Sequence, residues 1–444
     1  MIRTLLLGAA STLTLAGLAQ STTPANMAGM PGMSAPSSSP DPSFLAAQLQ
    51  HSTSGTSAEP ASIEAPMLMT MQRGWMLMLH GNGFVTELQQ QASAPRNRDK
   101  LFSTNWTMLM ASHAAGSRGQ VTLRTMLSLE PATITGRQFP ELFQQGETAF
   151  GSPIVDGQHP HDFFMELAAF YDLRLSRQTL LTIYAAPVGD PAIGPIAYPH
   201  RASAADNPLA TLGHHQQDST HIALSVLTAG LTWNKLRLEL SGFHGAEPTE
   251  QRWQLLPSPN GLAPDSYSAR LTYAPTPHWS MQYSLAHITS PEALYPGEDQ
   301  QRQTASVLYN RAFSSTATLD ASLVWGRTRS LSDQSKQNSY LAEALLTLHR
   351  SNHLSLRVED AGRSNELLLS PGSPLPAGFV ESPIGHVQAY SLGLDHDLPT
   401  AAHLSLAPGV QFTSDTAPRA LQAVYGSHPF SVALFLRLRL VPGA

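Results

Sequence analysis

Apolar and polar residues alternate along most of the chain after residue 67. In the final segment, one face carries Val432, Leu434, Leu436, Leu438 and Leu440, and the other carries Ser431, Ala433, Phe435, Arg437 and Arg439. Successive side chains of a β-strand point to opposite faces, so this period of two predicts a strand with one apolar face. Segments 236–240 and 354–359 repeat the pattern, and a less regular run begins at Val121.

The links between these segments alternate between short and long. Tight turns are expected near 116–119, 175–178, 233–235, 275–278, 314–316, 350–353 and 399–401. Longer links are expected near 90–100, 131–161, 188–217, 245–264, 290–301, 329–338, 363–385 and 413–429. Short turns at one end and long loops at the other are typical of outer-membrane barrels.

The fold class predicted is therefore all-β, a single transmembrane antiparallel β-barrel of about 16 strands with short periplasmic turns and long outer loops. An even strand number decides one ambiguous segment. Ala420–Tyr425 has the look of a short strand, but counting it would make the total odd, so 413–429 is assigned to the last outer loop. The final strand, 430–440, then places the C-terminus on the periplasmic side.

Composition narrows the class further. Only 13% of the residues are charged, against about 25% in an ordinary soluble protein. No apolar stretch after the N-terminus approaches 18 residues, which excludes a helical membrane protein. A net charge of −6 gives no reason to expect nucleic acid as a partner. The absence of cysteine excludes disulfides, thiolate metal sites and a catalytic thiol.

Three regions are expected along the chain. Residues 1–19 have the basic start, apolar stretch and small terminal residues of a signal peptide. Residues 20–65 are rich in Ser, Pro, Ala and Thr and are expected to form a disordered leader, and 66–444 are assigned to the barrel. Within the leader, Met27, Met30 and Met33 offer soft thioether ligands suited to copper as Cu(I), although three methionines are also compatible with simple low complexity.

Eighteen histidines raise the main chemical question. Imidazoles and carboxylates concentrate between residues 158 and 221, in two loops expected on the same side of the barrel, and suit Cu or Zn as a cofactor. The candidate metal ligands are His159, His161, Asp162, His200, His214, His215, Asp218 and His221. The alternative is a loop-packing network in which these groups satisfy one another's hydrogen bonds.

Charged residues on the polar faces of the strands are expected to face the lumen. They are Arg124, Glu166, Arg237, Arg357, Arg437 and Arg439. No catalytic residue is assigned and the protein is not expected to be an enzyme, since Asp218, Ser219 and His221 are too close in sequence to orient one another and no G-x-S-x-G motif is present. An envelope enzyme using a metal-activated water at the loop histidines stays as an alternative.

Two resemblances accompany these motifs. Gln158–Leu167, Pro187–Pro191, His214–His221 and Tyr425–Pro429 resemble segments of an uncharacterised family of predicted bacterial outer-membrane β-barrel proteins, over about residues 72–441. That family has no established activity, so the resemblance implies the barrel and little else. A weaker similarity, through Met27, Met30 and Met33, is to the copper-resistance outer-membrane proteins, which also combine a Met-rich leader with a barrel.

The sequence thus predicts a channel or binding-type barrel in the outer membrane of a Gram-negative-type bacterium, with a histidine-rich outer-loop cluster that is a candidate for metal binding. A structural or plugged barrel without a solute path is a further alternative. The expected partners are outer-membrane lipid, the barrel-assembly machinery during folding, and a small solute or metal ion.

Overall fold

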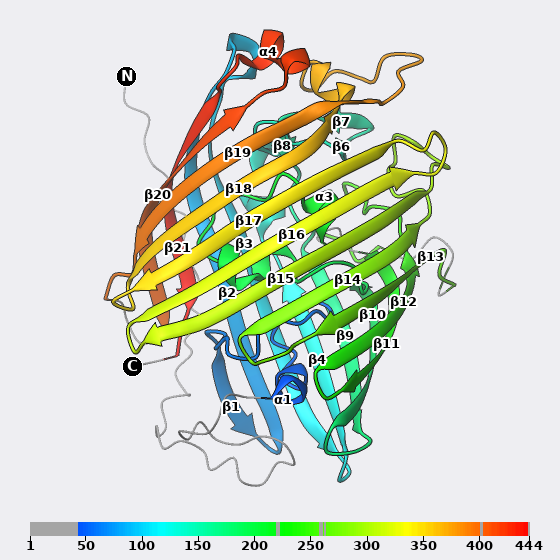
Figure 1. Cartoon of the computed structure of the whole chain (residues 1–444), viewed down its shortest axis with the longest axis vertical. Coiled ribbons are helices and arrows are strands. Elements are labelled where there is room, and N and C mark those ends of the chain that lie inside the picture. The colour runs from blue at the N-terminus through cyan, green and yellow to red at the C-terminus, as the bar shows by residue number, and fades with distance from the viewer. Residues whose placement is uncertain (1–42, 219–222, 257–260, 262, 400–402, 443–444) are drawn as a thin grey trace.

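The strands of the chain close into one antiparallel barrel (Figure 1). The structure is a computed structural model, and it describes residues 43–218, 223–256, 261, 263–399 and 403–442. Among these residues, 16 strands form the wall, as predicted. None of the helices in this part of the chain is both long and apolar enough to cross a membrane.

Neighbouring strands in the sequence are also neighbours in the wall. The last strand returns to the first, with Asn82 opposite Arg439 and Gln91 opposite Phe430, which closes the sheet. The wall strands are β2 (Trp75–Gln91), β3 (Arg98–Ala115), β4 (Gly119–Leu127), β9 (Phe164–Arg174), β10 (Thr179–Gly189), β11 (Ala223–Trp233), β12 (Leu236–His244), β13 (Ser266–Tyr273), β14 (Trp279–Ile288), β15 (Gln300–Ser314), β16 (Ala317–Ser330), β17 (Lys336–Leu348), β18 (Asn352–Ser364), β19 (Pro383–His396), β20 (Leu404–Thr416) and β21 (Phe430–Leu440).

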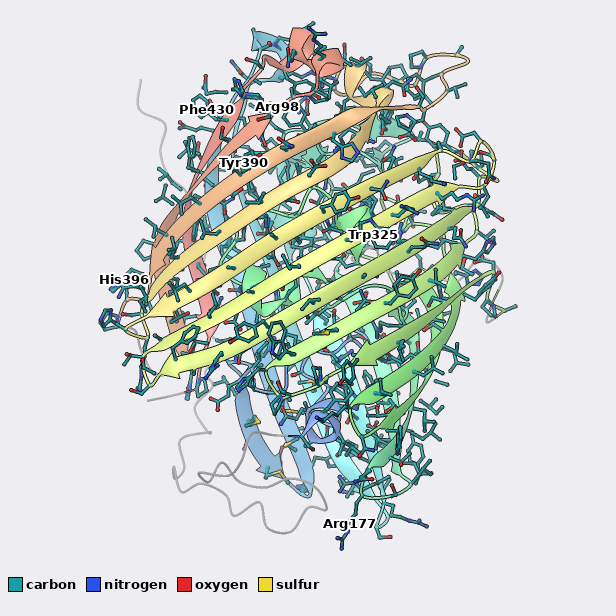
Figure 2. The ribbon with its side chains drawn as sticks, in the orientation of Figure 1. Arg98, Arg177, Trp325, Tyr390, His396 and Phe430 are labelled. Atoms are coloured by element: carbon teal, nitrogen blue, oxygen red, sulfur yellow. The ribbon has the colours of Figure 1, made fainter. Side chains whose placement is uncertain are left out.

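The predicted two-residue alternation is present in the wall. Along β12, Leu236, Leu238 and Leu240 are exposed on the outside, while Arg237 and Glu239 are buried inside. The barrel therefore has an apolar outer face and a polar inner face, as expected of a strand with lipid on one side. Trp325 and Tyr390 lie among the side chains of the outer face (Figure 2).

Turns and loops divide as the sequence predicted. Tight turns join the strands at the end where Arg177 and His396 lie, which we call the turn end, and longer segments gather at the opposite, loop end (Figure 2). The link at 399–401 lies mostly outside the described residues. Two expected long links are shorter, since only residues 92–97 separate β2 from β3 and only residues 331–335 separate β16 from β17. The last loop contains α4 (Arg419–Tyr425), so Ala420–Tyr425 is helical and is not a wall strand.

Residues 43–65 are packed inside the barrel, so the expectation of a disordered leader is wrong for this stretch. The segment begins with α1 (Phe44–Gln48) and is followed by β1 (Leu68–Gln72), which pairs with the start of β2. It is held by hydrogen bonds from side chains of the wall, described below, and we call residues 43–65 the N-terminal plug. Met27, Met30 and Met33, like the expected signal peptide, lie outside the described residues.

Two loops also occupy the lumen. Residues 128–163 contain α2 (Glu130–Thr133) and the strand pairs β5–β8 (Phe139–Pro140, Gly157–Gln158) and β6–β7 (Glu147–Ala149, Ser152–Ile154). The described part of the next loop, 190–218, contains α3 (His214–Gln217), which lies behind β16 and β17 in Figure 1. Buried apolar residues from both loops, among them Phe143 and Leu212, pack against the inner side of β18 and β19.

Candidate functional site

Three imidazoles converge on one buried carboxylate at the loop end of the lumen. Glu147 Oε1 lies 3.6 Å from His214 Nε2 and 3.3 Å from His215 Nε2. Glu147 Oε2 lies 3.9 Å from His159 Nε2 and accepts a hydrogen bond of 2.7 Å from the backbone N–H of His159. The candidate ligand atoms of Glu147, His214 and His215 all lie within 4.8 Å of one another, which is a spacing that a metal ion can close. We call these four residues the Glu147 cluster.

Local structure brings the cluster together. Glu147 begins the β6–β7 hairpin, and Gly146 before it has a φ of +89°, a left-handed conformation that glycine adopts without strain. Gly146 also lies close to the ring of His215, since a Cβ atom at this position would be 3.5 Å from its Nδ1. His214 and His215 are the first residues of α3, which places their rings 4.3 Å apart. The cluster therefore depends on contact between the two lumen loops.

Hydrogen bonds at the other ring nitrogens orient two of the imidazoles. His214 Nδ1 lies 2.8 Å from the carbonyl oxygen of Thr211, and His159 Nδ1 lies 3.0 Å from that of Pro160. A carbonyl oxygen only accepts, so a proton on Nδ1 of His159 satisfies its contact with Pro160. Nδ1 of His214 also lies 3.0 Å from the amide Nε2 of Gln144, and the rings of His214 and His215 hydrogen-bond the carboxylate of Glu147. Metal-binding histidines in proteins are fixed in this way by a backbone carbonyl.

The protonation states suit the same chemistry. Burial lowers the pKa of His159 to about 4 and that of His215 to about 3, so both rings are neutral at pH 7. Burial alone would raise the pKa of Glu147, but the neighbouring imidazoles of His159, His214 and His215 outweigh it, in part through hydrogen bonds to the carboxylate, and hold that pKa well below its ordinary value. Neutral imidazoles around a carboxylate are the forms that bind a metal ion.

Two cavities reach the cluster from the loop end. One, of about 240 Å³, is lined by His215 together with Glu247, Glu292, Glu381 and Arg302. The other, also about 240 Å³, is lined by His159, Arg252 and Trp253. Burial and the nearby Glu381 raise the pKa of Glu292 to about 8. The first cavity is thus an acidic vestibule in which an entering cation would displace protons.

The other sequence-predicted ligands do not join the cluster. His161 Nδ1 contacts Glu130 at 2.9 Å; burial opposes its protonation, but Glu130 outweighs burial and raises its pKa. Asp162 pairs with Arg252 at 2.9 Å. Asp218 lies 3.6 Å from Arg201, and His200 packs against Trp106 with a ring separation of 4.1 Å. His221 lies outside the described residues. Of the seven candidates that the structure describes, only His159, His214 and His215 meet.

Glu147 was missed by the sequence analysis. It stands in Gln144–Gln145–Gly146–Glu147, twelve residues before His159 and far from His214 in sequence, with no spacing that links the three. Only the folding of one lumen loop against the other makes it a ligand candidate.

Lumen-facing arginines bind the segments that fill the lumen. Arg124 donates to Glu166 and to the carbonyl oxygens of His51, Thr53 and Gly55 in the plug. Arg357 and Arg439 donate to carbonyl oxygens of the second lumen loop, those of Leu209, Ala210 and Ala205, and Arg237 donates to Gln48 of α1. Arg437 pairs with Asp395 and Asp206. These side chains face inward but bind protein groups, and they do not line an open path.

Comparison with known proteins identifies the class of fold. No family model matches the chain, and no curated protein matches it in sequence. Among solved structures, it is similar to OmpF of Salmonella typhi in complex with daunomycin, with a TM-score of 0.50 and 9% identity over 83% of this chain and 100% of that one. The outer-membrane channel DcaP of Acinetobacter baumannii aligns with 10% identity and a TM-score of 0.47 over 83% and 99% of the two chains. The fold is that of a porin-type outer-membrane β-barrel. Neither similarity bears on what this chain binds.

Proposed function

We propose that this chain is an outer-membrane β-barrel that binds a divalent transition-metal ion, such as Zn(II) or Cu(II), in a filled lumen through Glu147, His159, His214 and His215. The observation that carries the proposal is the convergence of three Nε2 atoms, at 3.3 to 3.9 Å, on one buried carboxylate. Imidazole and carboxylate ligands suit these metals. Glu147 supplies the negative charge, and the three imidazoles fix the geometry.

The proposed location follows from the wall. Leu231, Leu238 and Leu285 are among many exposed apolar side chains on the outer face, and a closed barrel satisfies its backbone hydrogen bonds without water. We place the turn end, with the C-terminus, in the periplasm and the loop end outside the cell. The vestibule and the Glu147 cluster then face the medium, from which the metal ion would enter.

Metal retention by the full chain tests this proposal. The protein is purified in detergent, loaded with Zn(II), desalted and measured by elemental analysis and by isothermal titration. We expect one bound equivalent, and a loss of affinity of at least about tenfold in Glu147→Gln and in His214→Gln, since each removes one ligand. His396→Gln is the matched control, because His396 lies at the turn end and hydrogen-bonds Asn352 (Figure 2).

The outcomes separate the metal site from a loop-packing network. If the wild-type protein retains no metal after loading, or if Glu147→Gln binds Zn(II) as the wild type does, the proposal is wrong. Loss of binding in His396→Gln as well would mean that the metal is held elsewhere. Unchanged strand content by circular dichroism is required of every variant.

A further inference from the structure

Half of the chain's methionines gather in one buried cluster inside the barrel. Of 14 methionines, seven share it with Val188 and Leu224. They are Met67, Met76, Met78, Met108, Met110, Met126 and Met165, each at most 9% exposed. We call this set the methionine chamber. It uses no residue of the Glu147 cluster.

Strand register places four of its methionines and His80 side by side. His80 on β2 lies opposite Met108 on β3, and Met108 lies opposite Met126 on β4. One step toward the turn end, Met78 lies opposite Met110. All five are buried, so they share the inner face of three adjacent strands. Directly opposed residues of neighbouring strands have Cβ atoms about 4.5–5.5 Å apart, which brings their side chains into contact.

This patch departs from the chemistry of the rest of the wall. The inner face of a membrane barrel is normally polar, and elsewhere in this wall it carries Arg237, Glu239 and Arg270. Close packing against Ala65 and Met67, at the end of the plug, would account for apolar side chains here. It would not account for the repeated choice of thioethers, or for the imidazoles that accompany them.

Two imidazoles at the chamber have ring nitrogens without a hydrogen-bond partner. His80 is 8% exposed, and its Nδ1 is buried and unpaired; both ring nitrogens of His200 are also buried and unpaired. The indole of Trp106 lies between them, 4.5 Å from the ring of His80 and 4.1 Å from that of His200. A buried nitrogen without a partner is unfavourable, so these rings are suited to a ligand that provides one.

We propose that His80, Met108 and Met126, with Met78 and Met110 beside them, form a binding site for a soft monovalent d10 cation, Cu(I), for which Ag(I) is a redox-inert probe. Thioether sulfur and imidazole nitrogen are the soft and borderline ligands that such ions prefer, whereas Zn(II) is bound by imidazole, thiolate and carboxylate. The proposal is independent of the divalent site, because it rests on different residues and a different class of ion.

Silver binding by the full-length protein tests the site. Ag(I) is titrated in chloride-free buffer, and its coordination is measured by X-ray absorption. We expect one equivalent bound mainly through sulfur, and a loss of affinity of at least about tenfold in the double variant Met108→Leu/Met126→Leu and in His80→Gln. Leucine conserves the volume of methionine, so the packing of the chamber should survive. Met281→Leu on β14 is the matched control, because Met281 lies outside the chamber.

Two further variants separate the alternatives. If Ag(I) binds in the chamber, the variant Met27→Leu/Met30→Leu/Met33→Leu should bind it as the wild type does. Loss of the bound Ag(I) in this variant would assign silver to the leader and overturn the proposal. In Glu147→Gln, Zn(II) binding should fall while Ag(I) binding stays. Unaltered Ag(I) affinity in Met108→Leu/Met126→Leu, or coordination by nitrogen and oxygen alone, would also overturn it.

Discussion

At the scale of single residues, Arg124 connects the wall to the plug. Its guanidinium forms two hydrogen bonds with Glu166, of 2.6 and 2.8 Å, and donates to the carbonyl oxygens of His51 at 2.7 Å and Gly55 at 2.6 Å. Arginine alone can do this, because its planar fork carries five donors in fixed directions. The wall thus binds the plug through its backbone, and the single side chain of Arg124 hydrogen-bonds several plug residues.

Replacement of this arginine gives the first prediction. Arg124→Lys keeps the charge but loses most of the fork, so buried carbonyls of the plug lose their donors at a cost of about 1–3 kcal/mol. We expect faster cleavage within residues 43–65 by proteinase K, measured by mass spectrometry on the folded protein in detergent. Trypsin would be uninformative, since this stretch has no lysine or arginine.

The control for this prediction is Arg177→Lys, in an exposed turn at the far end of the barrel (Figure 2). It should leave the cleavage rate as in the wild type. Equal protection of the plug in Arg124→Lys would show that the other wall contacts suffice without the fork.

At the scale of elements, the sequence predicted the wall far better than its contents. Apolar and polar residues must alternate along a strand that has one face in an apolar environment. The neighbouring residues Leu236, Arg237 and Leu238 are therefore enough to show which side chains point outward. Residues 43–65 carry no such pattern, and their composition favoured disorder. Their order comes from donors that lie elsewhere in the sequence, on the wall. The same holds for Glu147, whose partners come from residues 159 and 214–215.

Glu59 makes the docking of the plug dependent on pH. Its Oε1 accepts a hydrogen bond of 2.7 Å from the backbone N–H of Ala202, and burial raises its pKa to about 8 against an ordinary value near 4.5. Between pH 4.5 and 8, the carboxyl of Glu59 therefore keeps its proton when the plug is docked and loses it when the plug is released. Its favourable contribution to docking is complete below pH 4.5 and is lost as pH rises through 8.

We accordingly predict that the plug is better protected from proteinase K at pH 6 than at pH 9. The docking equilibrium should change by up to about tenfold per pH unit between pH 6 and 8, and by little above pH 8. Glu59→Gln, which resembles the protonated form, should abolish the difference between the two pH values. Glu64→Gln, in an exposed position of the same segment, is the control and should respond as the wild type does. A Glu59→Gln protein that keeps the full pH dependence would assign it to another group.

At the scale of the whole molecule, the barrel has the strand number of an open pore but a filled interior. The plug crosses the inner face from β4 to β15, through contacts that include Arg124, Arg270 and Asn310. Above it, two wall carboxylates hold the second lumen loop, residues 190–218. Glu343 pairs with Arg201 of the loop, and Glu359 accepts a hydrogen bond from the N–H of Leu212. Charged groups that would line a water-filled channel bind backbone and side chains of these segments instead.

The filled lumen predicts little ion flow. In a planar bilayer, the full-length protein should give steady conductance steps at least about tenfold smaller than those of an open 16-stranded porin under the same salt and voltage, since barrels of equal strand number have similar diameters and differ only in what occupies them. Arg124→Lys should flicker more often, because plug release then becomes more frequent, whereas Arg177→Lys should match the wild type. Steps as large as those of the open porin would mean that the plug and lumen loops leave the barrel in the membrane, and would favour a solute channel over a metal-binding barrel.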